Sequence, residues 1–280
     1  MSTTTRFAPS PTGYLHLGHA FAAITAAMAG DRLLLRIEDI DAGRCHPEFE
    51  AAIFEDLSWL GLDWRKPVLR QRARMPAYRE ALESLRARDL IYPCFCTRQE
   101  IALEVARSVE APHGPDGPVY PGTCRGLSPG ERSKRIASGL PYAVRLDVAK
   151  AAAMAGSLTF EERGAGPRGD AGRIAVDPLL FGDVVLARKD IPTAYHLAVV
   201  VDDAFQDVDL VTRGNDLFAA AHIQRLLQEL LGLPAPAYAH HRLILDAEGR
   251  KFSKRDRAVT LRAMRERGVT PDEIRAQLGF

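Results

Sequence analysis

The chain has 280 residues, of which 46% are hydrophobic and 26% are charged. This length and composition fit one large globular domain or two smaller ones, and four cysteines are too few for a disulfide scaffold. The formal net charge of +1 excludes a general electrostatic attraction to nucleic acid, so any surface that binds nucleic acid must be a local basic patch.

The first predicted elements are a strand over residues 3–7 and a helix over residues 20–29. The strand is β-branched and aromatic, and the helix is an almost unbroken run of Ala, Ile, Phe and Met. Between them, His16 and His19 are one helical turn apart, so both imidazoles face the same way at a helix start. Such a start suits an anion such as a phosphate, and Gly18 lets a ligand approach the backbone closely. Two surface histidines beside an ordinary turn are the alternative.

The next predicted strand, over residues 32–37, is apolar enough to be a buried parallel strand, and it leads directly into Glu38, Asp39 and Asp41. Ligands of open α/β sheets bind beyond the carboxyl ends of the strands, so we expect these carboxylates to face the same crevice as the histidines. Glu38 is the candidate for holding a substrate ammonium group. An acidic turn at the end of a strand is the alternative.

Helical spacing of apolar residues predicts two further helices, over residues 46–62 and 75–90, with a loop over residues 63–67 between them. In the second of these helices the apolar positions face the same side of the helix. The residues expected in the core there are Tyr78, Leu82 and Leu85.

The composition changes at Cys94 and Cys96, which precede a stretch over residues 111–130 that is rich in Pro and Gly and contains Cys124. Such a stretch buries little core of its own, so a metal staple is physically plausible. Three thiolates suggest Zn²⁺, which takes four ligands, and from chemistry alone His113 is the expected fourth ligand. Three ordinary reduced cysteines are the alternative.

Alternating side chains after the cysteines predict strands that return the chain to the sheet. The predicted strands cover residues 142–148, 157–161, 181–190, 195–203, 208–215 and 238–245. Asp216 is expected to cap a helix that extends to Leu231. Thr270 is expected to cap a last helix that has Pro271 at its first position.

Two residues on the predicted strands of the second half, Tyr195 and Arg213, are expected near the crevice. A guanidinium group can make a two-pronged bond with a carboxylate, which the ammonium group of a lysine cannot replace. The alternative is a tyrosine at the edge of the core and an arginine on the surface.

A basic segment, Gly-Arg-Lys-Phe-Ser-Lys-Arg, occupies residues 249–255. Its glycine and serine suggest a loop, and Lys251 and Lys254 would neutralise the charge of a polyphosphate. A solvated basic turn is the alternative for this segment taken alone.

Together, the histidine and lysine segments, His16-Leu-Gly-His19 and Lys251-Phe-Ser-Lys-Arg255, resemble the two signatures of class I aminoacyl-tRNA synthetases. Two further segments have sequences similar to those of the glutamate-specific branch of that family. They are residues 6–13, Arg-Phe-Ala-Pro-Ser-Pro-Thr-Gly, and residues 35–41, Leu-Arg-Ile-Glu-Asp-Ile-Asp. The resemblance extends from about Arg6 to Arg255, which is nearly the whole chain.

This resemblance implies an α/β fold, a Rossmann-like class I catalytic domain with a zinc-containing insertion and a short C-terminal region of helices and the lysine loop. It divides the chain into a first half of the nucleotide-binding domain (1–90), an insertion that grips the acceptor end of tRNA (91–178), a second half (179–235) and the lysine-loop and helical region (236–280).

The resemblance also implies site residues for the activation of L-glutamate by ATP, with Mg²⁺ on the phosphates. The implied catalytic residues are His16, His19, Lys251 and Lys254. The implied glutamate-binding residues are Arg6, Ala8, Ser10, Glu38, Tyr195 and Arg213. The implied ATP-binding residues are His16, Gly18, His19 and Lys254.

Within the glutamate branch, the small glutamyl-queuosine tRNA(Asp) synthetases carry Cys-x-Cys followed by Tyr-x-x-x-Cys, and Cys94, Cys96, Tyr120 and Cys124 match this pattern. The match implies one structural Zn²⁺ with Tyr120 as the fourth ligand, and His113 is the alternative. A bound metal lowers the pKa of a phenol as it does that of water, so a phenolate ligand is feasible.

Full-length glutamyl-tRNA synthetases continue past the lysine loop into a region that reads the anticodon, and this chain has no residues left for it. We therefore expect transfer of glutamate to the queuosine base of tRNA(Asp). No leader and no apolar run of membrane length is evident, so a cytoplasmic protein without a membrane partner is expected, and we expect a monomer.

Three alternatives belong to other functional classes. The first is a shortened conventional glutamyl-tRNA synthetase that charges the 3′ end of tRNA. The second is a non-catalytic sensor of glutamate or adenylate, which the presence of both histidines and both lysines disfavours. The third is another nucleotidyltransferase of the same fold, which the match in the glutamate pocket disfavours.

Overall fold

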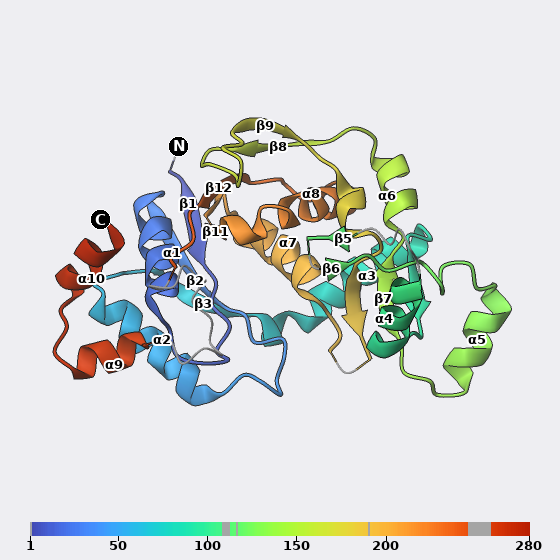
Figure 1. Ribbon diagram of the computed structural model, residues 1–280, viewed down its shortest axis with the longest axis horizontal. Helices are drawn as coiled ribbons and strands as arrows, with labels where there is room; N and C mark the ends of the chain where they lie inside the picture. The colour runs from blue at the N-terminus through green and yellow to red at the C-terminus, as the bar shows by residue number, and fades with distance from the viewer. Residues whose placement is uncertain (1, 108–112, 116, 190, 246–258) are drawn as a thin grey trace.

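The computed structural model describes residues 2–107, 113–115, 117–189, 191–245 and 259–280 (Figure 1). The predicted lysine-loop residues, Lys251 and Lys254, lie outside the described residues, and so does the side chain of His113. No helix in the described part of the chain is both long and apolar enough to cross a membrane.

Among the described residues, the largest sheet has seven strands in the order β3-β2-β1-β11-β12-β8-β9. All neighbouring strands in it are parallel except β8 and β9, which form an antiparallel pair at one edge. The strand bounds are β1 (Thr4–Phe7), β2 (Arg32–Ile37), β3 (Arg65–Arg70), β8 (Thr159–Glu162), β9 (Gly172–Ala175), β11 (Leu210–Gly214) and β12 (Ala237–His241). The strand order reverses between β1 and β11, which is where doubly wound folds bind their ligands.

Helices cover both faces of this sheet, as Figure 1 shows. On one face, apolar side chains of β1 and β2 share a core cluster with the first helices and the C-terminal helices. These helices are α1 (Leu17–Met28), α2 (Pro47–Trp59), α9 (Leu261–Glu266) and α10 (Pro271–Leu278). On the other face, Leu34 and Val211 contact a cluster that includes Ala221 of α8. The elements on this side are η1 (Gln71–Arg74), α3 (Met75–Ala87), α7 (Tyr195–Phe205), η3 (Asn215–Leu217) and α8 (Ala220–Leu231).

A separate antiparallel sheet lies at the other end of the molecule (Figure 1). This three-stranded sheet has the order β10-β7-β4, with strands β4 (Ile91–Cys94), β7 (Ala143–Leu146) and β10 (Val185–Arg188). The remaining elements are α4 (Arg98–Arg107), β5 (His113–Gly114), β6 (Gly117–Pro118), α5 (Pro129–Ala137), α6 (Val148–Ala155) and η2 (Pro178–Phe181). The four-part division of the chain stays a prediction, and β8 and β9, which fall within residues 91–178, extend the large sheet.

Most predicted elements are confirmed: the parallel α/β sheet, the buried strand over residues 32–37, and the last helix, which begins at Pro271 after the cap Thr270. Tyr78, Leu82 and Leu85 are buried as expected. The physical reason is that these segments carry local signals, an apolar period or a capping residue, that long-range packing does not override.

Three predictions of secondary structure are wrong. Residues 195–203 belong to helix α7 rather than to a strand, because this helix is buried on most sides and its apolar run carries no clear period. The predicted loop over residues 63–67 includes the start of strand β3. Asp216 does not cap α8, because the turn η3 intervenes and α8 begins at Ala220.

Candidate active site

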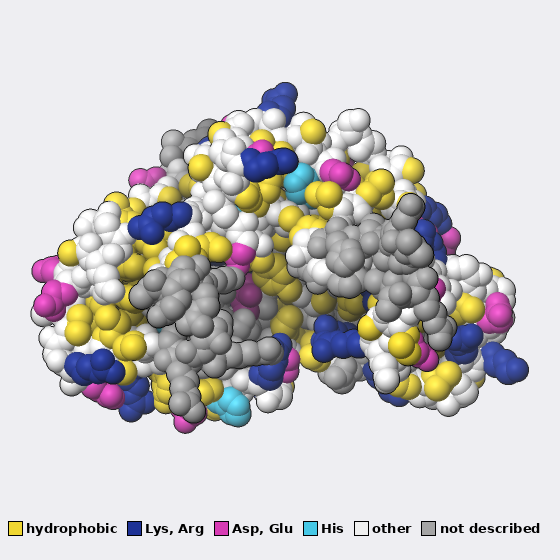
Figure 2. Space-filling model, in the orientation of Figure 1, with side chains coloured by type: hydrophobic (Ala, Val, Ile, Leu, Met, Phe, Trp, Pro, Cys, Tyr) yellow, Lys and Arg dark blue, Asp and Glu magenta, His cyan; other side chains and the backbone are white. Residues whose placement is uncertain are grey.

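A cavity of about 500 Å³ lies at the carboxyl ends of β1 and β11, where the strand order reverses. Figure 2 shows this face of the molecule hollowed between its two ends, with acidic and hydrophobic side chains visible in the hollow. The cavity is lined by every described residue that was predicted to bind glutamate or ATP. These residues are Arg6, Ala8, Ser10, His16, Gly18, His19, Glu38, Tyr195 and Arg213. The structure thus brings together residues from β1, α1, β2, α7 and β11, while their individual roles stay predictions.

The two histidines cap helix α1 reciprocally. Nδ1 of His16 accepts a hydrogen bond from the Gly18 N–H at 3.1 Å, and Nδ1 of His19 accepts one from the His16 N–H at 3.2 Å. Their ring centroids are 3.8 Å apart. Because both Nδ1 atoms accept, each neutral ring carries its proton on Nε2, which is the kind of donor that a phosphate oxygen accepts from. The cap therefore fixes the tautomer and the direction of both imidazoles.

Gly18 is required by the packing of this cap as well as by ligand access. A Cβ atom at this position would lie 3.1 Å from Cε1 and 3.2 Å from Nδ1 of His16. Contacts this short would push the imidazole away from the backbone N–H that it accepts from. The glycine therefore lets the first histidine lie flat against the start of the helix.

Arg6 is held by the protein itself. Its Nε donates to Asp203 Oδ1 at 3.1 Å and its Nη1 donates to the Thr212 carbonyl at 2.9 Å, and the side chain is buried. The same Asp203 oxygen accepts from Arg36 Nη2 at 2.7 Å. Asp203 is buried, which raises its pKa, but the two guanidinium groups outweigh burial and lower the pKa overall. Asp203 therefore stays ionised and balances part of the charge of Arg6, since it also pairs with Arg36.

Glu38 is a mostly buried carboxyl directly after β2, with its side chain 12% exposed. Its Oε1 lies 3.8 Å from Nε of Arg36. Burial raises its pKa to about 7, and the nearby guanidinium groups of Arg36 and Arg6 oppose this rise only in part. A substrate ammonium group beside Glu38 would stabilise the carboxylate form, since an opposite charge in a buried site favours ionisation.

Arg213 differs from Arg6 because part of its guanidinium group is left for a ligand. Nη1 donates to the Tyr195 Oη at 3.3 Å and Nε donates to His240 Nε2 at 3.3 Å. Nη2 is buried and has no hydrogen-bond partner among the described residues. Because a buried guanidinium nitrogen without a partner is costly, Nη2 offers a donor that an anionic group such as a carboxylate would accept from.

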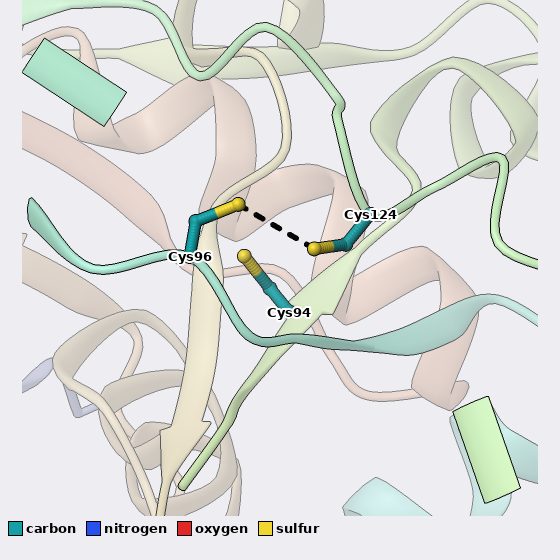
Figure 3. Close-up of side chains that lie close together, drawn as sticks. All are labelled: Cys94, Cys96 and Cys124. Carbon is teal, nitrogen blue, oxygen red and sulfur yellow. Dashed lines mark hydrogen bonds between the residues drawn. The ribbon is translucent and has the colours of Figure 1, made fainter. Parts of the chain in front are cut away.

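The predicted metal ligands converge at a second place, beyond β4. The sulfur atoms of Cys94, Cys96 and Cys124 lie within 4.8 Å of one another, and Figure 3 shows all three pointing to a common centre. The Tyr120 Oη is 3.6 Å from Cys96 Sγ and accepts a hydrogen bond from the Cys124 N–H at 2.8 Å. A tetrahedral zinc with Zn–S bonds of about 2.3 Å holds its sulfurs about 3.8 Å apart, so this donor set fits Zn²⁺.

Burial and hydrogen bonds shift the pKa values of the side chains in this cluster. Burial raises the pKa of the Cys96 thiol to about 12, and burial also raises the pKa of the Tyr120 phenol. The pKa of Cys124 is also raised by burial, but hydrogen bonds from the Phe95 N–H and from Tyr120 outweigh it and lower the pKa. Two buried sulfurs, the partly buried sulfur of Cys96 and a phenol oxygen lie close together, and their ionised forms are costly unless a cation joins them.

Sequence reasoning missed the residues that hold the cavity arginines. Asp203 was read as part of a strand, and Glu162 and His240 were given no role, although each proves to be buried. One signal was available: Asp202 and Asp203 interrupt an otherwise apolar run, and buried carboxylates are rarely without a partner. The partners themselves, 197 residues away for Arg6, leave no local trace in the sequence.

Comparison with known proteins defines the class to which this fold and cavity belong. The family model described as "tRNA synthetases class I (E and Q), catalytic domain" matches residues 2–279. The chain therefore belongs to this family of class I tRNA synthetases, and it is a ligase.

Within the family, the relatives differ in how much of their own length this chain covers. It is 50% identical to the glutamyl-Q tRNA(Asp) synthetase of Rhodobacter capsulatus, over 99% of both chains. It is 40% identical to the glutamate–tRNA ligase of Aquifex aeolicus, covering 96% of this chain and 55% of that protein. A crystal structure of the glutamate-tRNA synthetase from Elizabethkingia anophelis has a TM-score of 0.73 at 29% identity, covering 91% of this chain and 53% of that one.

Proposed function

We propose that the protein activates L-glutamate with ATP as glutamyl-adenylate and then transfers the glutamyl group to the queuosine base of tRNA(Asp). The observation that carries the acceptor is the 50% identity, over 99% of both chains, to a protein named glutamyl-Q tRNA(Asp) synthetase. The observation that supports glutamate is the cavity itself, which offers a guanidinium group at Arg213 and a carboxyl at Glu38 for the two kinds of charge on an amino acid.

In this proposal Arg213 and Arg6 interact with different carboxylates of glutamate. Arg213 receives the side-chain carboxylate of glutamate, because its Nη2 is buried without a protein partner. Arg6 supplies positive charge near the α-carboxylate, although Asp203 already balances part of that charge. Glu38 and Ser10 receive the α-ammonium group. The pocket thereby selects a substrate with two carboxylates and one ammonium group.

Activation joins the α-carboxylate to the α-phosphorus of ATP. One carboxylate oxygen attacks the phosphorus, the bond to the β-phosphate oxygen breaks, and pyrophosphate leaves with the electron pair of that bond. The Nε2–H groups of His16 and His19 donate to phosphate oxygens on which charge accumulates, at the positive end of helix α1. Lys251 and Lys254, which lie outside the described residues, are assigned the same task, and bound Mg²⁺ supplies further neutralisation of the phosphates.

Transfer then requires an acceptor next to the adenylate. A second cavity, of about 350 Å³, shares Tyr195 with the first cavity and extends to Tyr120 of the cysteine cluster. Arg145, Arg188 and Phe181 also line it. Guanidinium groups and an aromatic ring are the side chains that bind phosphates and stack on bases, so this cavity suits the acceptor nucleotide. A hydroxyl oxygen of the acceptor attacks the glutamyl carbonyl carbon and the bond from this carbon to the phosphate oxygen breaks. AMP leaves with the electron pair of that bond, and the hydroxyl proton passes to AMP or to water.

We further propose that Cys94, Cys96, Cys124 and Tyr120 hold one structural Zn²⁺. The ion would neutralise the thiolates and tie strand β4 to the loop that precedes α5. Tyr120 lines the second cavity and none of the four proposed ligands lines the first, so the ion would lie beside the second cavity and away from the first. We expect the enzyme to act in the cytoplasm as a monomer.

The test is an acylation assay. The protein is incubated with ATP, Mg²⁺ and labelled glutamate, together with tRNA(Asp) that contains or lacks queuosine, and the attached label is measured before and after removal of the 3′-terminal nucleoside. We expect label that depends on queuosine and survives this removal. Label that is independent of queuosine and lost with the terminal nucleoside would instead support a conventional glutamyl-tRNA synthetase activity, and no label with any tRNA would support a sensor.

A further inference from the structure

Three polar side chains on neighbouring strands form a buried row behind the glutamate pocket. Arg213 of β11 is paired in register with His240 of β12, and Glu162 of β8 lies beside β12 on its other side. Glu162 and His240 are 1% and 2% exposed, and Arg213 is 6% exposed. Of the three, Arg213 lines the first cavity, so the other two are placed to act through it.

Glu162 is fully occupied by hydrogen bonds. Its Oε1 accepts from the backbone N–H groups of His240 and Gly164, each at 2.8 Å, and its Oε2 is 2.5 Å from His240 Nδ1. Burial raises the pKa of this carboxyl, but the hydrogen bonds from His240 and Gly164 outweigh burial and lower the pKa overall. Glu162 is therefore a carboxylate that only accepts hydrogen bonds.

The partner on the other side of the ring determines the position of the imidazole proton. Arg213 Nε is always a donor, so His240 Nε2, 3.3 Å away, must accept. A ring that accepts at Nε2 carries its proton on Nδ1, and this proton is donated to Glu162. Burial and the neighbouring guanidinium group lower the pKa of His240, in spite of the carboxylate of Glu162, which keeps the ring neutral.

The row controls how the guanidinium group lies. Nε is held by His240, Nη1 is held by the Tyr195 Oη, and the group lies over the ring of Tyr238 at 4.9 Å. These contacts fix the guanidinium plane and leave Nη2 for a ligand. A hydrogen bond from Nη2 to a carboxylate depends on that plane, because the N–H groups of Nη2 lie in it and must point at the carboxylate oxygens.

We propose that Glu162 and His240 are positioning residues for substrate recognition: the Glu162 carboxylate keeps the His240 proton on Nδ1, so that Nε2 orients Arg213 toward the side-chain carboxylate of the substrate. This inference rests on the proposed function, since it takes a dicarboxylic amino acid as the ligand of Arg213. The binding of glutamate then depends on the Nδ1 proton of His240, which acts on the substrate only through Arg213.

The substitution Glu162→Gln tests the position of the proton with little change of shape. The amide oxygen still accepts from the two backbone N–H groups, but the amide nitrogen now donates to His240 Nδ1. The ring proton must move to Nε2, where it opposes the N–H of Arg213. We expect the KM for glutamate in ATP–pyrophosphate exchange to rise about tenfold, while the KM for ATP changes by less than about twofold.

The matched control is Glu161→Gln, on the same strand, where the glutamate is exposed. This variant makes the same chemical change on the other side of β8, and it should leave both KM values unchanged. Nitrogen-15 spectra of the histidines provide a readout that a merely structural role would not move. We expect the His240 signal to report the Nδ1–H tautomer in the wild type and the Nε2–H tautomer in Glu162→Gln.

Two substitutions of His240 separate positioning from packing. His240→Asn places an amide near the Nδ1 position, so it keeps a donor to Glu162 but has no acceptor for Arg213. His240→Gln places a carbonyl oxygen near the Nε2 position, so it restores that acceptor. We expect the KM for glutamate to rise about tenfold in His240→Asn and to recover partly in His240→Gln. This order of KM values should hold irrespective of which variant has the lower stability.

The outcomes are distinct. An unchanged KM for glutamate in Glu162→Gln, or equal KM values in the two His240 variants, overturns the positioning role while the wild type remains an active glutamate-activating enzyme. A wild-type protein without glutamate-dependent exchange overturns the proposed function, and the positioning role is lost with it.

Discussion

Glu38 is a side chain of the cavity whose charge depends on pH near neutrality. Burial raises its pKa to about 7 from an ordinary value of 4.5. The folded protein therefore binds a proton at Glu38 between these pH values that the unfolded chain does not bind. The contribution of Glu38 to stability is present below pH 4.5 and is lost as the pH rises through about 7. In the proposed site, glutamate binding has the opposite dependence, because an ammonium group bound at Glu38 requires the carboxylate form.

The first prediction at the residue scale follows from this charge. The affinity for glutamate should rise about tenfold per pH unit as the pH approaches 7 from below, and it should then level off, because Glu38 is ionised above its pKa. Titration calorimetry with glutamate between about pH 5.5 and 8 measures this slope. Glu38→Gln should bind more weakly and lose the slope, and a slope of the same size in this variant would assign the pH dependence to another group.

The arginines illustrate how similar residues acquire different tasks. Arg6 and Arg213 both line the cavity, but only Arg6 has a protein carboxylate, Asp203, as its partner. Arg213 instead has neutral partners, a tyrosine hydroxyl and an imidazole, that orient it without neutralising it. An arginine that is oriented and not neutralised retains its attraction for an anion, which explains why Arg213 is assigned to the substrate side chain.

At the scale of elements, the cysteine cluster connects strand β4 to a region with little core of its own. Cys94 is the last residue of β4, and Cys124 lies in the loop before α5. Helix α5 itself has no buried side chain. The core cluster at this place consists mainly of the proposed ligands and Tyr92. A metal ion would therefore replace the apolar burial that the loop cannot provide.

The prediction at this scale concerns metal content. Cys124→Ser should release zinc, measured as bound metal per protein, because a hydroxyl is a far weaker ligand than a thiolate. Adenylate formation should stay within about threefold of the wild type, since no proposed ligand lines the first cavity, whereas transfer to tRNA should fall. Cys45→Ser changes the one cysteine outside the cluster, and it should retain full zinc content. Loss of activation together with the metal would mean that the ion also supports the first cavity.

At the scale of the whole molecule, the C-terminal half of α7 joins the large sheet to the helical elements that cover it. Asp203 reaches Arg6 and Arg36 on the large sheet. Its neighbour Asp202 accepts hydrogen bonds from side chains of η1 and α3. The donors are Gln71 (3.0 Å), Arg74 (3.2 Å) and Tyr78 (2.6 Å). Two adjacent carboxylates on one helix thus connect the strands that carry the cavity to the helices that cover them.

We expect Asp202→Asn to destabilise the fold by about 3 kcal/mol, because an amide cannot accept from all three donors and leaves Arg74 without its charge partner. Urea unfolding measures the change. The control is Asp207→Asn, since Asp207 is exposed with a φ of 50° that asparagine tolerates, and its effect should stay within about 0.5 kcal/mol. Equal unfolding midpoints for the two variants would show that α7 is not the connection described here.

Much of the cavity could be predicted from the sequence because its residues lie in short segments with local signals. The two histidines and Gly18 occupy one helical turn at a strand-to-helix junction, and Glu38 directly follows a buried strand. In parallel sheets such positions converge at one edge, whatever the details of packing. The same locality explains why the cysteine spacing indicated a cluster before the three sulfurs were seen within 4.8 Å of one another.

The sequence by itself therefore determined the class of fold, the cavity residues and the chemistry that they offer. Only the tertiary structure decided that residues 195–203 form a helix, because a buried apolar run fits either a strand or a helix until its neighbours are known. Only the tertiary structure paired Asp203 with Arg6, and Glu162 with His240. These contacts span 197 and 78 residues and depend on the order of strands in the sheet, which no local pattern in the chain encodes.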